Sequence, residues 1–464
     1  MILNRITKFN APLARKEFST WRGLEKDLKF SIDKKTTANL LSQDGVTFTR
    51  ASLAYNNNSS GNLVSVASGE PGYEYSGATS LGLRIEKGST NKIVNTVMDE
   101  CATSGKLWTT ADAATLGVET DVSSPDGGTN GISMSGWGGT HVVETPPTKF
   151  HIVYDTTNVA ASGAFGGWSA SVYAKAGNVP YFGFAFCNTV KIGAAFNLSD
   201  GSIVNSYNCT ASIEDVGDGW YRCKCENLQN VASYMVFAFT CSKTTGGVWN
   251  DSGLGAWYSR AESFSTSGSF PSVTHVANHV FLFGPQFEDS TFCTSYMANP
   301  SELTAGVARA ADIATITGSN FSSFYNASEG TFAVEGTRTT AGSSALPTLM
   351  EVNDGGTSDT IGFNTSATKE QFDIYGPSGA ATIETVNDIA KHTAIKVAGA
   401  YKANKYAASG SSSTVAVNTL AAVPTVNQLA VGKSAHGREL NGHVKRIRYY
   451  SRRLTDKQIK TLST

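Results

Sequence analysis

Short stretches of alternating apolar and polar residues, separated by polar turns, make up most of the chain. Residues 169–175 alternate in this way, the run PYFGFAF from Pro180 is largely apolar, and a GDG turn at 217–219 leads into the strand-like WYRCKCE. Side chains on a strand point alternately to its two faces, so a period of two predicts short strands. We therefore expect an all-β chain of antiparallel β-sandwiches. No internal repeat of fixed period indicates a solenoid or a propeller.

The same pattern continues towards the C-terminus. In the segment EGTFAVEG, Phe332 and Val334 are expected to face inward, and Thr331, Ala333 and Glu335 to face outward. Further strands are expected at residues 393–400 and 428–432.

Helical signals are confined to the two ends of the chain. Thr455 and Gln458 form a capping box, and Ile459 and Leu462 continue it as an apolar stripe. These residues predict a short C-terminal helix. Near the N-terminus, residues 18–29 are compatible with another short helix.

The length of 464 residues requires more than one domain, because single hydrophobic cores stop growing at roughly 250–300 residues. The stretch SELTAGVARAAD, residues 301–312, has the composition of a linker. We expect, in chain order, an attachment arm at 1–45, a small β segment at 46–94, a first sandwich at 95–300, the linker at 301–312, and a second sandwich at 313–464.

The nearly neutral net charge argues against partners that would bind the chain mainly through electrostatic attraction. The net charge is -1 and charged residues make up 16% of the chain, so we expect neither nucleic acid nor an anionic membrane as a partner. The first 35 residues nevertheless contain nine Lys and Arg against four acids. Such an arm suits docking on an acidic neighbour, and the alternative is a solvated terminus. No apolar run reaches the ~18 residues of a membrane helix, and MILNRITKFN lacks a signal-peptide core, so we expect synthesis in a cytosol.

Cysteine and histidine spacing gives no support for a metal, a cofactor or catalysis. The seven Cys contain no C-x-x-C pair, and we expect neither a disulfide framework nor a metal site. Cys223 and Cys225 lie two apart in a strand-like run, so both should point into the core. His275 and His279 have no third ligand and no helix to present them. No G-x-S-x-G or Walker motif is present, and no catalytic residue is expected.

Three segments resemble structural proteins of bacteriophage particles. VTFTRAS at 46–52, followed by LGLRIEKGSTNKI at 81–93, resembles a signature of that family, in which Arg50 and Glu86 would pair. The resemblance to a jelly-roll, carbohydrate-binding-like module rests on FNLSDGSIV, VGDGWYRCKCE and FGPQFEDSTFCTSYM. EGTFAVE through NGHVKRIRYYSRRLTDKQI resembles a concanavalin or laminin-G sandwich.

The resemblance implies a structural component of a virion, such as a tail fibre, a spike or a capsid decoration (head) fibre. Such a subunit would present lectin-like sandwiches for host attachment or particle assembly. Its partners would be other virion proteins, bound through the N-terminal arm, host-surface glycan, and two further copies in a homotrimer. The alternatives are a virion-associated glycan depolymerase and a secreted lectin.

The depolymerase alternative needs paired carboxylates. Catalytic relatives of the concanavalin fold carry them at alternate positions of one strand, where the side chains share a face. No E-x-D-x-x-E or E-x-D-x-E occurs in this chain. Glu329 and Glu335 are six residues apart and are expected to face solvent. We therefore expect a protein that is not an enzyme.

Aromatic side chains are the candidate ligand contacts, because sugar rings stack on exposed Trp or Tyr in β-sandwiches. The alternative for each Trp is the core, which we expect for Trp220. Asp354, in NDGG, suits a turn better than a calcium site, since no dense D-x-D-x-D array surrounds it. Five Trp near Gly, Ser or Asn are the candidates: Trp108, Trp137, Trp168, Trp249 and Trp257.

Overall fold

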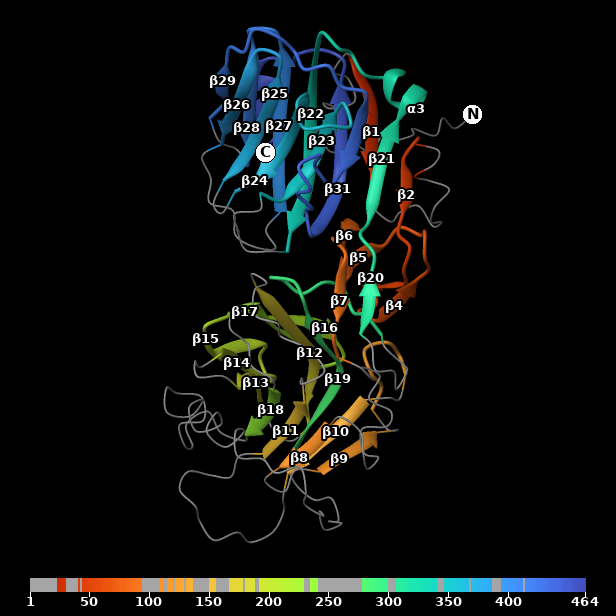
Figure 1. The fold of residues 1–464 in the computed structure, drawn as a ribbon, viewed down its shortest axis with the longest axis vertical. Helices are drawn as coiled ribbons and strands as arrows, with labels where there is room; N and C mark the ends of the chain where they lie inside the picture. The colour runs from red at the N-terminus through yellow and green to blue at the C-terminus, as the bar shows by residue number, and fades with distance from the viewer. Residues whose placement is uncertain are drawn as a thin grey trace, which may run out of the picture. The chain divides into compact units, whose positions relative to one another are not determined.

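A computed structural model describes much of the chain, in a series of segments. Strands predominate in these segments (Figure 1), which confirms the all-β class. The chain divides into two compact units. The C-terminal unit contains residues 1–48, 82–85 and 313–464, and the central unit contains residues 49–81 and 86–312. The described residues are 23–30, 41, 44–93, 108–111, 115–119, 122–128, 131–136, 150–155, 167–177, 180–187, 192–228, 234–240, 278–298, 306–339, 346–366, 369–385, 394–411 and 414–464.

Two antiparallel sheets and a hairpin form the central unit. The first sheet has, in spatial order, β16 (Thr210–Gly217), β17 (Trp220–Leu228), β12 (Trp168–Ala176), β19 (Asn278–Glu288), β10 (Gly131–Gly136) and β9 (Thr115–Glu119). β7 (Ser89–Asn91) pairs with β19, and β20 (Val307–Arg309) pairs with β7. The second sheet has β15 (Ser202–Tyr207), β14 (Ile192–Asn197), β13 (Tyr181–Cys187), β18 (Tyr234–Thr240), β11 (Phe150–Asp155) and β8 (Trp108–Ala111). The hairpin consists of β3 (Ala54–Asn57) and β4 (Leu63–Val66).

The main core of the central unit lies between its two sheets. Val172, Cys223 and Cys225 from the first sheet pack with Phe182 and Phe196 from the second, and all five are buried. The expectation that both cysteines point into the core is confirmed.

The opposite face of the first sheet is also buried. Tyr173 and Trp220 point to this side and pack with Leu63 of the β3–β4 hairpin and with Tyr296. The Trp220 indole donates a hydrogen bond to the Ser123 carbonyl at 2.9 Å. Trp220 is therefore a core residue, as expected.

The C-terminal unit is a second two-sheet sandwich. Its first sheet has β29 (Ala416–Asn418), β28 (Tyr406–Gly410), β27 (Ala394–Lys402), β22 (Glu329–Arg338) and β31 (Gly442–Tyr450), with β1 (Leu24–Lys29) and the end of β6 (Thr79–Ile85) both paired to β31. The strand next to β6, β5 (Tyr73–Ser76), belongs to the residues of the central unit. The second has β2 (Thr47–Thr49), β21 (Ile313–Thr317), β30 (Gln428–Val431), β23 (Thr348–Asn353), β24 (Thr360–Thr365), β25 (Glu370–Gly376) and β26 (Gly379–Glu384). A short helix, α3 (Gly318–Ser322), follows β21.

The two sheets of the C-terminal unit approach closely at Gly399. A Cβ atom at this position of β27 would lie 2.8 Å from Phe372 and 2.9 Å from Phe363, two core residues of the facing sheet. Glycine is therefore required at this point of close approach.

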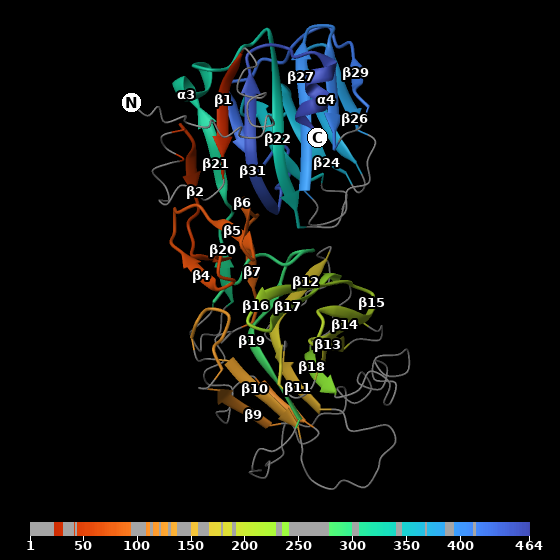
Figure 2. The same cartoon turned by 180° about the vertical axis from the view of Figure 1, so that it is seen from behind.

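The C-terminal helix α4 (Asp456–Leu462) covers the outer face of the first sheet, over β22, β27 and β28 (Figure 2). Its capping box between Thr455 and Gln458 is present, as predicted. Ile459 and Leu462 pack on small side chains of the strands, among them Ala333. Ala333 does face away from the sandwich core, as expected, but it is only 1% exposed because α4 lies over it.

Part of the expected N-terminal arm is a strand of the C-terminal unit. Residues 24–29 form β1, where a short helix was the expectation, and they pair antiparallel with β31. Leu28 is 1% exposed, and the Asp27 carboxylate accepts two hydrogen bonds of 2.7 Å from Arg446. The described sandwich thus begins at β1, which differs from the expected boundary at 313. The expected β segment at 46–94 is likewise divided between the two units.

Candidate functional site

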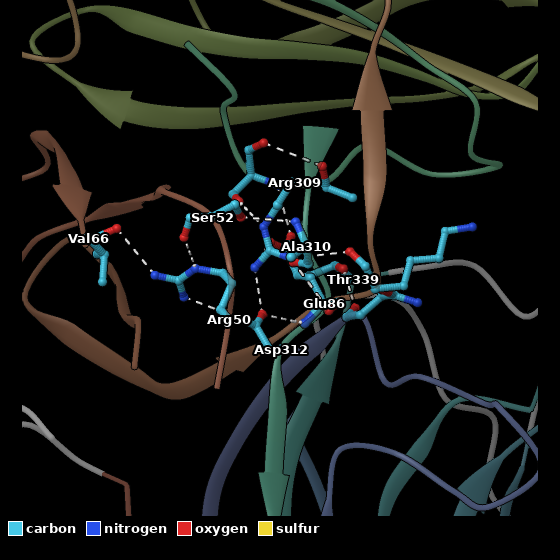
Figure 3. A network of polar contacts seen from close by, with 12 residues as sticks. Arg50, Ser52, Val66, Glu86, Arg309, Ala310, Asp312 and Thr339 are labelled. Atoms are coloured by element: carbon cyan, nitrogen blue, oxygen red, sulfur yellow. Dashed lines mark hydrogen bonds and ion pairs between the residues drawn. The ribbon is translucent and has the colours of Figure 1, made fainter. Parts of the chain in front are cut away.

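Buried charged side chains gather in the central unit around Arg50, Glu86, Arg309 and Asp312, which we call the arginine clamp (Figure 3). Arg50 forms an ion pair with Asp312 at 3.2 Å, and Arg309 forms ion pairs with Asp312 at 2.5 Å and with Glu86 at 3.1 Å. The four side chains are 1–4% exposed. The expected pairing of Arg50 and Glu86 thus takes the form of a shared network, joined through Asp312 and Arg309.

The arginine clamp also holds backbone groups. Arg50 donates to the Ala67 carbonyl at 2.8 Å, and the carboxylates of Asp312 and Glu86 accept from the N–H groups of Glu86 and Ser295, each at 2.9 Å. Buried charges persist in a protein when they are paired and hydrogen-bonded in this way. The contacts of the clamp are therefore those of a structural network. Two of its members, Arg309 and Asp312, come from the expected linker at 301–312, of which residues 307–309 form β20.

The segment FGPQFEDSTFCTSYM forms a second structural cluster. The buried Glu288 carboxylate accepts hydrogen bonds from the Thr294 hydroxyl at 2.7 Å and from the Gln286 amide at 3.0 Å. The Gln286 carbonyl oxygen in turn accepts from the Met297 N–H. Burial raises the pKa of Glu288, although its hydrogen bonds with Thr294 act in the opposite direction. These contacts fix the loop after β19 and explain the motif without a ligand.

A third set of polar side chains lies on the outer face of the second sheet in the C-terminal unit. Glu351, Gly362 and Asp373 are directly opposite one another on β23, β24 and β25. The neighbouring positions of these strands, such as Val352 and Ile374, point to the core. The register therefore presents two carboxyl groups on one face, with a glycine between them.

Hydrogen bonds hold both carboxyl groups in place. The Asn364 amide donates to Asp373 Oδ2 at 2.6 Å, and the Asn353 amide donates to Glu351 Oε1 at 2.9 Å. Asp373 Oδ1 is buried and has no hydrogen-bond partner among the described residues. A buried acceptor of this kind usually binds a water molecule or a ligand donor.

A short loop, residues 433–439, lies against this face. Its Ala435 N–H donates to Glu351 Oε1 at 2.7 Å, and Arg438 Nη1 is 3.9 Å from Asp373 Oδ2. The His436 ring is 5.3 Å from the Tyr375 ring. Burial raises the pKa of Glu351, against the opposing effect of the Ala435 N–H and the Asn353 amide.

This set is the candidate site, which we call the polar face. It combines a buried acceptor that has no hydrogen-bond partner in the described part of the chain, a half-buried guanidinium, a half-buried tyrosine ring and an exposed imidazole. Planar polar groups beside an aromatic ring can orient hydroxyl groups and contact the apolar side of a sugar ring. The members of the polar face are Glu351, Asn364, Asp373, Tyr375, His436 and Arg438.

Sequence reasoning did not find the polar face. Its members come from four separate segments, and none stands in a recognised motif. Strand-by-strand alternation assigns Asp373 to the face opposite Phe372 and Ile374, but only the register brings it into line with Glu351.

The expected tryptophan candidates have different outcomes. The Trp168 ring is 7% exposed and stacks on Phe287 at 4.8 Å, which agrees with the core alternative and leaves little surface for a sugar. Trp108 lies in β8, but its side chain is outside the described residues. Trp137, Trp249 and Trp257 also lie outside the described residues.

The other candidates from the sequence concern ions and membranes. The Asp354 carboxylate accepts a hydrogen bond from the Gly356 N–H at 2.8 Å, as in the expected turn. Within the described segments no three His, Cys, Asp or Glu side chains are grouped so that they could hold a metal ion. None of the helices described is long and apolar enough to cross a membrane.

Comparison with known proteins gives weak structural similarities. No family model and no curated protein matches the chain. The CBM40 of the Ruminococcus gnavus IT-sialidase, bound to α2,3-sialyllactose, is 11% identical, with 31% of this chain and 88% of that chain covered and a TM-score of 0.28. Domain 4 of AbnA, a GH43 arabinanase from Geobacillus stearothermophilus in complex with arabinotriose, is 11% identical, with 33% and 73% covered and a TM-score of 0.27. A heptameric SAP-like pentraxin from Limulus polyphemus is 9% identical, with 29% and 70% covered and a TM-score of 0.24. Similarities this low carry no inference about this chain.

Proposed function

We propose that the chain is a non-catalytic structural subunit of a bacteriophage particle that binds host-surface glycan through the polar face. The observation that carries the binding proposal is the buried Asp373 Oδ1, which has no partner among the described residues and lies on the same sheet face as Tyr375. The sequence resemblance described above supports the assignment to a virion. Other virion proteins and further copies of the chain are the proposed partners.

The chemistry of the polar face suits a hydroxyl-rich ligand. Asp373 Oδ2 is occupied by the Asn364 amide, and Oδ1 is buried, so Oδ1 would accept a hydrogen bond from a water molecule that bridges to a ligand hydroxyl. Arg438 would donate to a ligand oxygen, and the Tyr375 ring would contact the C–H side of a sugar ring. Because few groups take part, each site would bind weakly.

A glycoside hydrolase is the competing function, favoured by one observation. Glu351 and Asp373 share a face, and Glu351 has the raised pKa that a general acid needs. However, Glu351 is 2% exposed, and its Oε1 already accepts hydrogen bonds from Ala435 and Asn353. These contacts make Glu351 an anchor for the loop at 433–439, and we therefore propose binding without turnover.

Binding of the full-length protein to purified host-surface polysaccharide, measured by calorimetry, tests the proposal. We expect Tyr375→Ala and Arg438→Ala each to weaken binding about tenfold, which corresponds to ~1.4 kcal/mol. Lys433→Ala is the matched control, because Lys433 is in the same loop but pairs with Glu439. Unchanged affinity in both variants would exclude the polar face as the binding site. Release of reducing sugar by the wild-type protein, abolished in Glu351→Gln, would establish the hydrolase instead.

A further inference from the structure

Two cysteine sulfurs of the central unit lie in contact. The Sγ atoms of Cys209 and Cys225 are 3.2 Å apart, and both residues are free thiols in this structure. Cys225 is on β17, opposite Ala211 of β16. Cys209 precedes the first residue of β16, so the two side chains meet diagonally across the start of this hairpin.

The backbone at Cys209 belongs to a turn between two strands. Cys209 lies outside β16 and follows Asn208, which has a φ of 50° in the turn after β15. A disulfide requires an S–S distance of ~2.05 Å, about 1 Å shorter than the present contact. A small shift of the turn and a change in the side-chain torsions of Cys209 would close this distance.

The two thiols differ in access. Cys209 is half-buried at the edge of the core, whereas Cys225 is 0% exposed. Cys209 is therefore the more accessible residue of the pair for an external oxidant, and Cys225 lies in place to complete the bond.

We propose that Cys209 and Cys225 are a disulfide-forming pair that closes when the protein meets an oxidant such as glutathione disulfide. The Cys209 thiolate attacks one sulfur of glutathione disulfide, forms a mixed disulfide and releases one glutathione thiolate. Cys225 then loses its proton and attacks the Cys209 sulfur, which releases the second glutathione. The protein loses two protons and two electrons, and glutathione disulfide is reduced to two glutathione molecules.

The thiolate needed for the first step forms most easily at Cys209. Its hydrogen bond with Cys225 lowers the pKa of Cys209, and hydrogen bonds with the backbone of Gly193 and Tyr207 add to this effect. Burial raises the pKa of Cys225 well above its ordinary value. The order of attack therefore follows from both access and acidity.

Other described cysteines lack this arrangement. Cys223 shares the strand and the core face of Cys225, and burial raises the pKa of both thiols. Cys293 is buried, and its thiol donates to the Ala170 carbonyl at 3.3 Å. Cys223 is thus a matched control for Cys225. The pairing escapes sequence analysis because Cys209 and Cys225 are 16 positions apart and follow no spacing rule.

The full-length protein, incubated with glutathione disulfide and then digested without reduction, provides the test. Mass spectrometry should identify one cross-linked peptide pair, containing Cys209 and Cys225 and lacking two hydrogens. The bridge closes a short loop, so oxidised protein should melt about 5–10 °C above reduced protein. Cys209→Ser should abolish both the cross-link and the shift, whereas Cys223→Ala should keep both.

The wild-type peptide map decides the outcome even where a variant folds poorly. A Cys209–Cys225 peptide that appears with the oxidant and disappears with a reductant supports the proposal. No cross-link, a cross-link to a different cysteine, or a melting shift that persists in Cys209→Ser would overturn it. Because none of these measurements involves glycan, their failure would leave the proposed function unaffected.

Discussion

Gly362 gives the polar face its geometry. A Cβ atom at this position would lie 3.2 Å from Glu351 Cγ, so the absent side chain leaves space between the carboxyl groups of Glu351 and Asp373. Alternation along a strand predicts that residue 373 points away from the core. It cannot predict that residues 351, 362 and 373 are in line, because that alignment depends on the register of three strands.

Glu351 should make the stability of the C-terminal unit depend on pH. Burial raises its pKa in the folded state above the ordinary value of 4.5. The protonated form therefore stabilises the fold fully below about pH 4.5, and this contribution is lost as the pH rises through the folded-state pKa. Glu351→Gln is neutral at every pH and should be more stable than the wild type at neutral pH, by on the order of 1 kcal/mol. Urea unfolding at a series of pH values measures the difference, which should vanish in acid.

Glu384→Gln, on the same sheet, is the control, because Glu384 should affect the stability of the fold with the opposite pH dependence. Hydrogen bonds from Lys369 and Gln371 lower the pKa of Glu384. The contribution of ionised Glu384 to the stability of the fold is therefore fully present above about pH 4.5, its ordinary pKa, and is lost as the pH falls through the folded-state pKa. This variant should be slightly less stable than the wild type at neutral pH, since the group is half-exposed. A constant difference between wild type and Glu351→Gln across the pH series would contradict the assignment to Glu351.

At the scale of elements, α4 and β1 show what the sequence could and could not predict. The capping box at Thr455 and the stripe of Ile459 and Leu462 depend only on local spacing, and the predicted helix is present. Residues 24–29 mix charged and apolar side chains, and their strand is fixed by pairing with β31, more than 400 positions away. Local patterns therefore predicted the helix and several strands, such as β12, β22, β27 and β30, whereas pairings over long sequence distances were not accessible.

The β1 strand should contribute to the stability of the C-terminal unit. Leu28 is opposite Ile447 of β31 and is 1% exposed, so Leu28→Ala leaves a cavity and should cost about 2–4 kcal/mol. Lys29→Ala is the control, because the Lys29 side chain is 53% exposed. Denaturant unfolding of the full-length protein measures both. Equal stability of the two variants would show that residues 1–45 are a separable arm, as the sequence alone suggested.

At the scale of the whole molecule, the chain passes between its two units more than once. The boundaries fall at 48–49, 81–82, 85–86 and 312–313. Arg50, Glu86 and Asp312 of the arginine clamp lie within two residues of three of these boundaries. The clamp therefore fixes, inside the central unit, the ends of segments that continue into the C-terminal unit. This arrangement gives a structural reason for the motif around Arg50 and Glu86, which the resemblance alone left unexplained.

We predict that the protein acts as a homo-oligomer, most simply a trimer, that holds a glycan surface through several weak sites. A polar face with so few contacts would bind glycan weakly by itself, whereas linking several sites raises avidity by a factor of ~10²–10⁴ without any new contact. Light scattering at micromolar concentration should give the mass of three chains. The trimer should dissociate much more slowly from densely coated polysaccharide than from sparsely coated polysaccharide. A monomer in solution whose dissociation rate is the same at both densities would contradict the prediction, because a single site cannot respond to the spacing of its ligands.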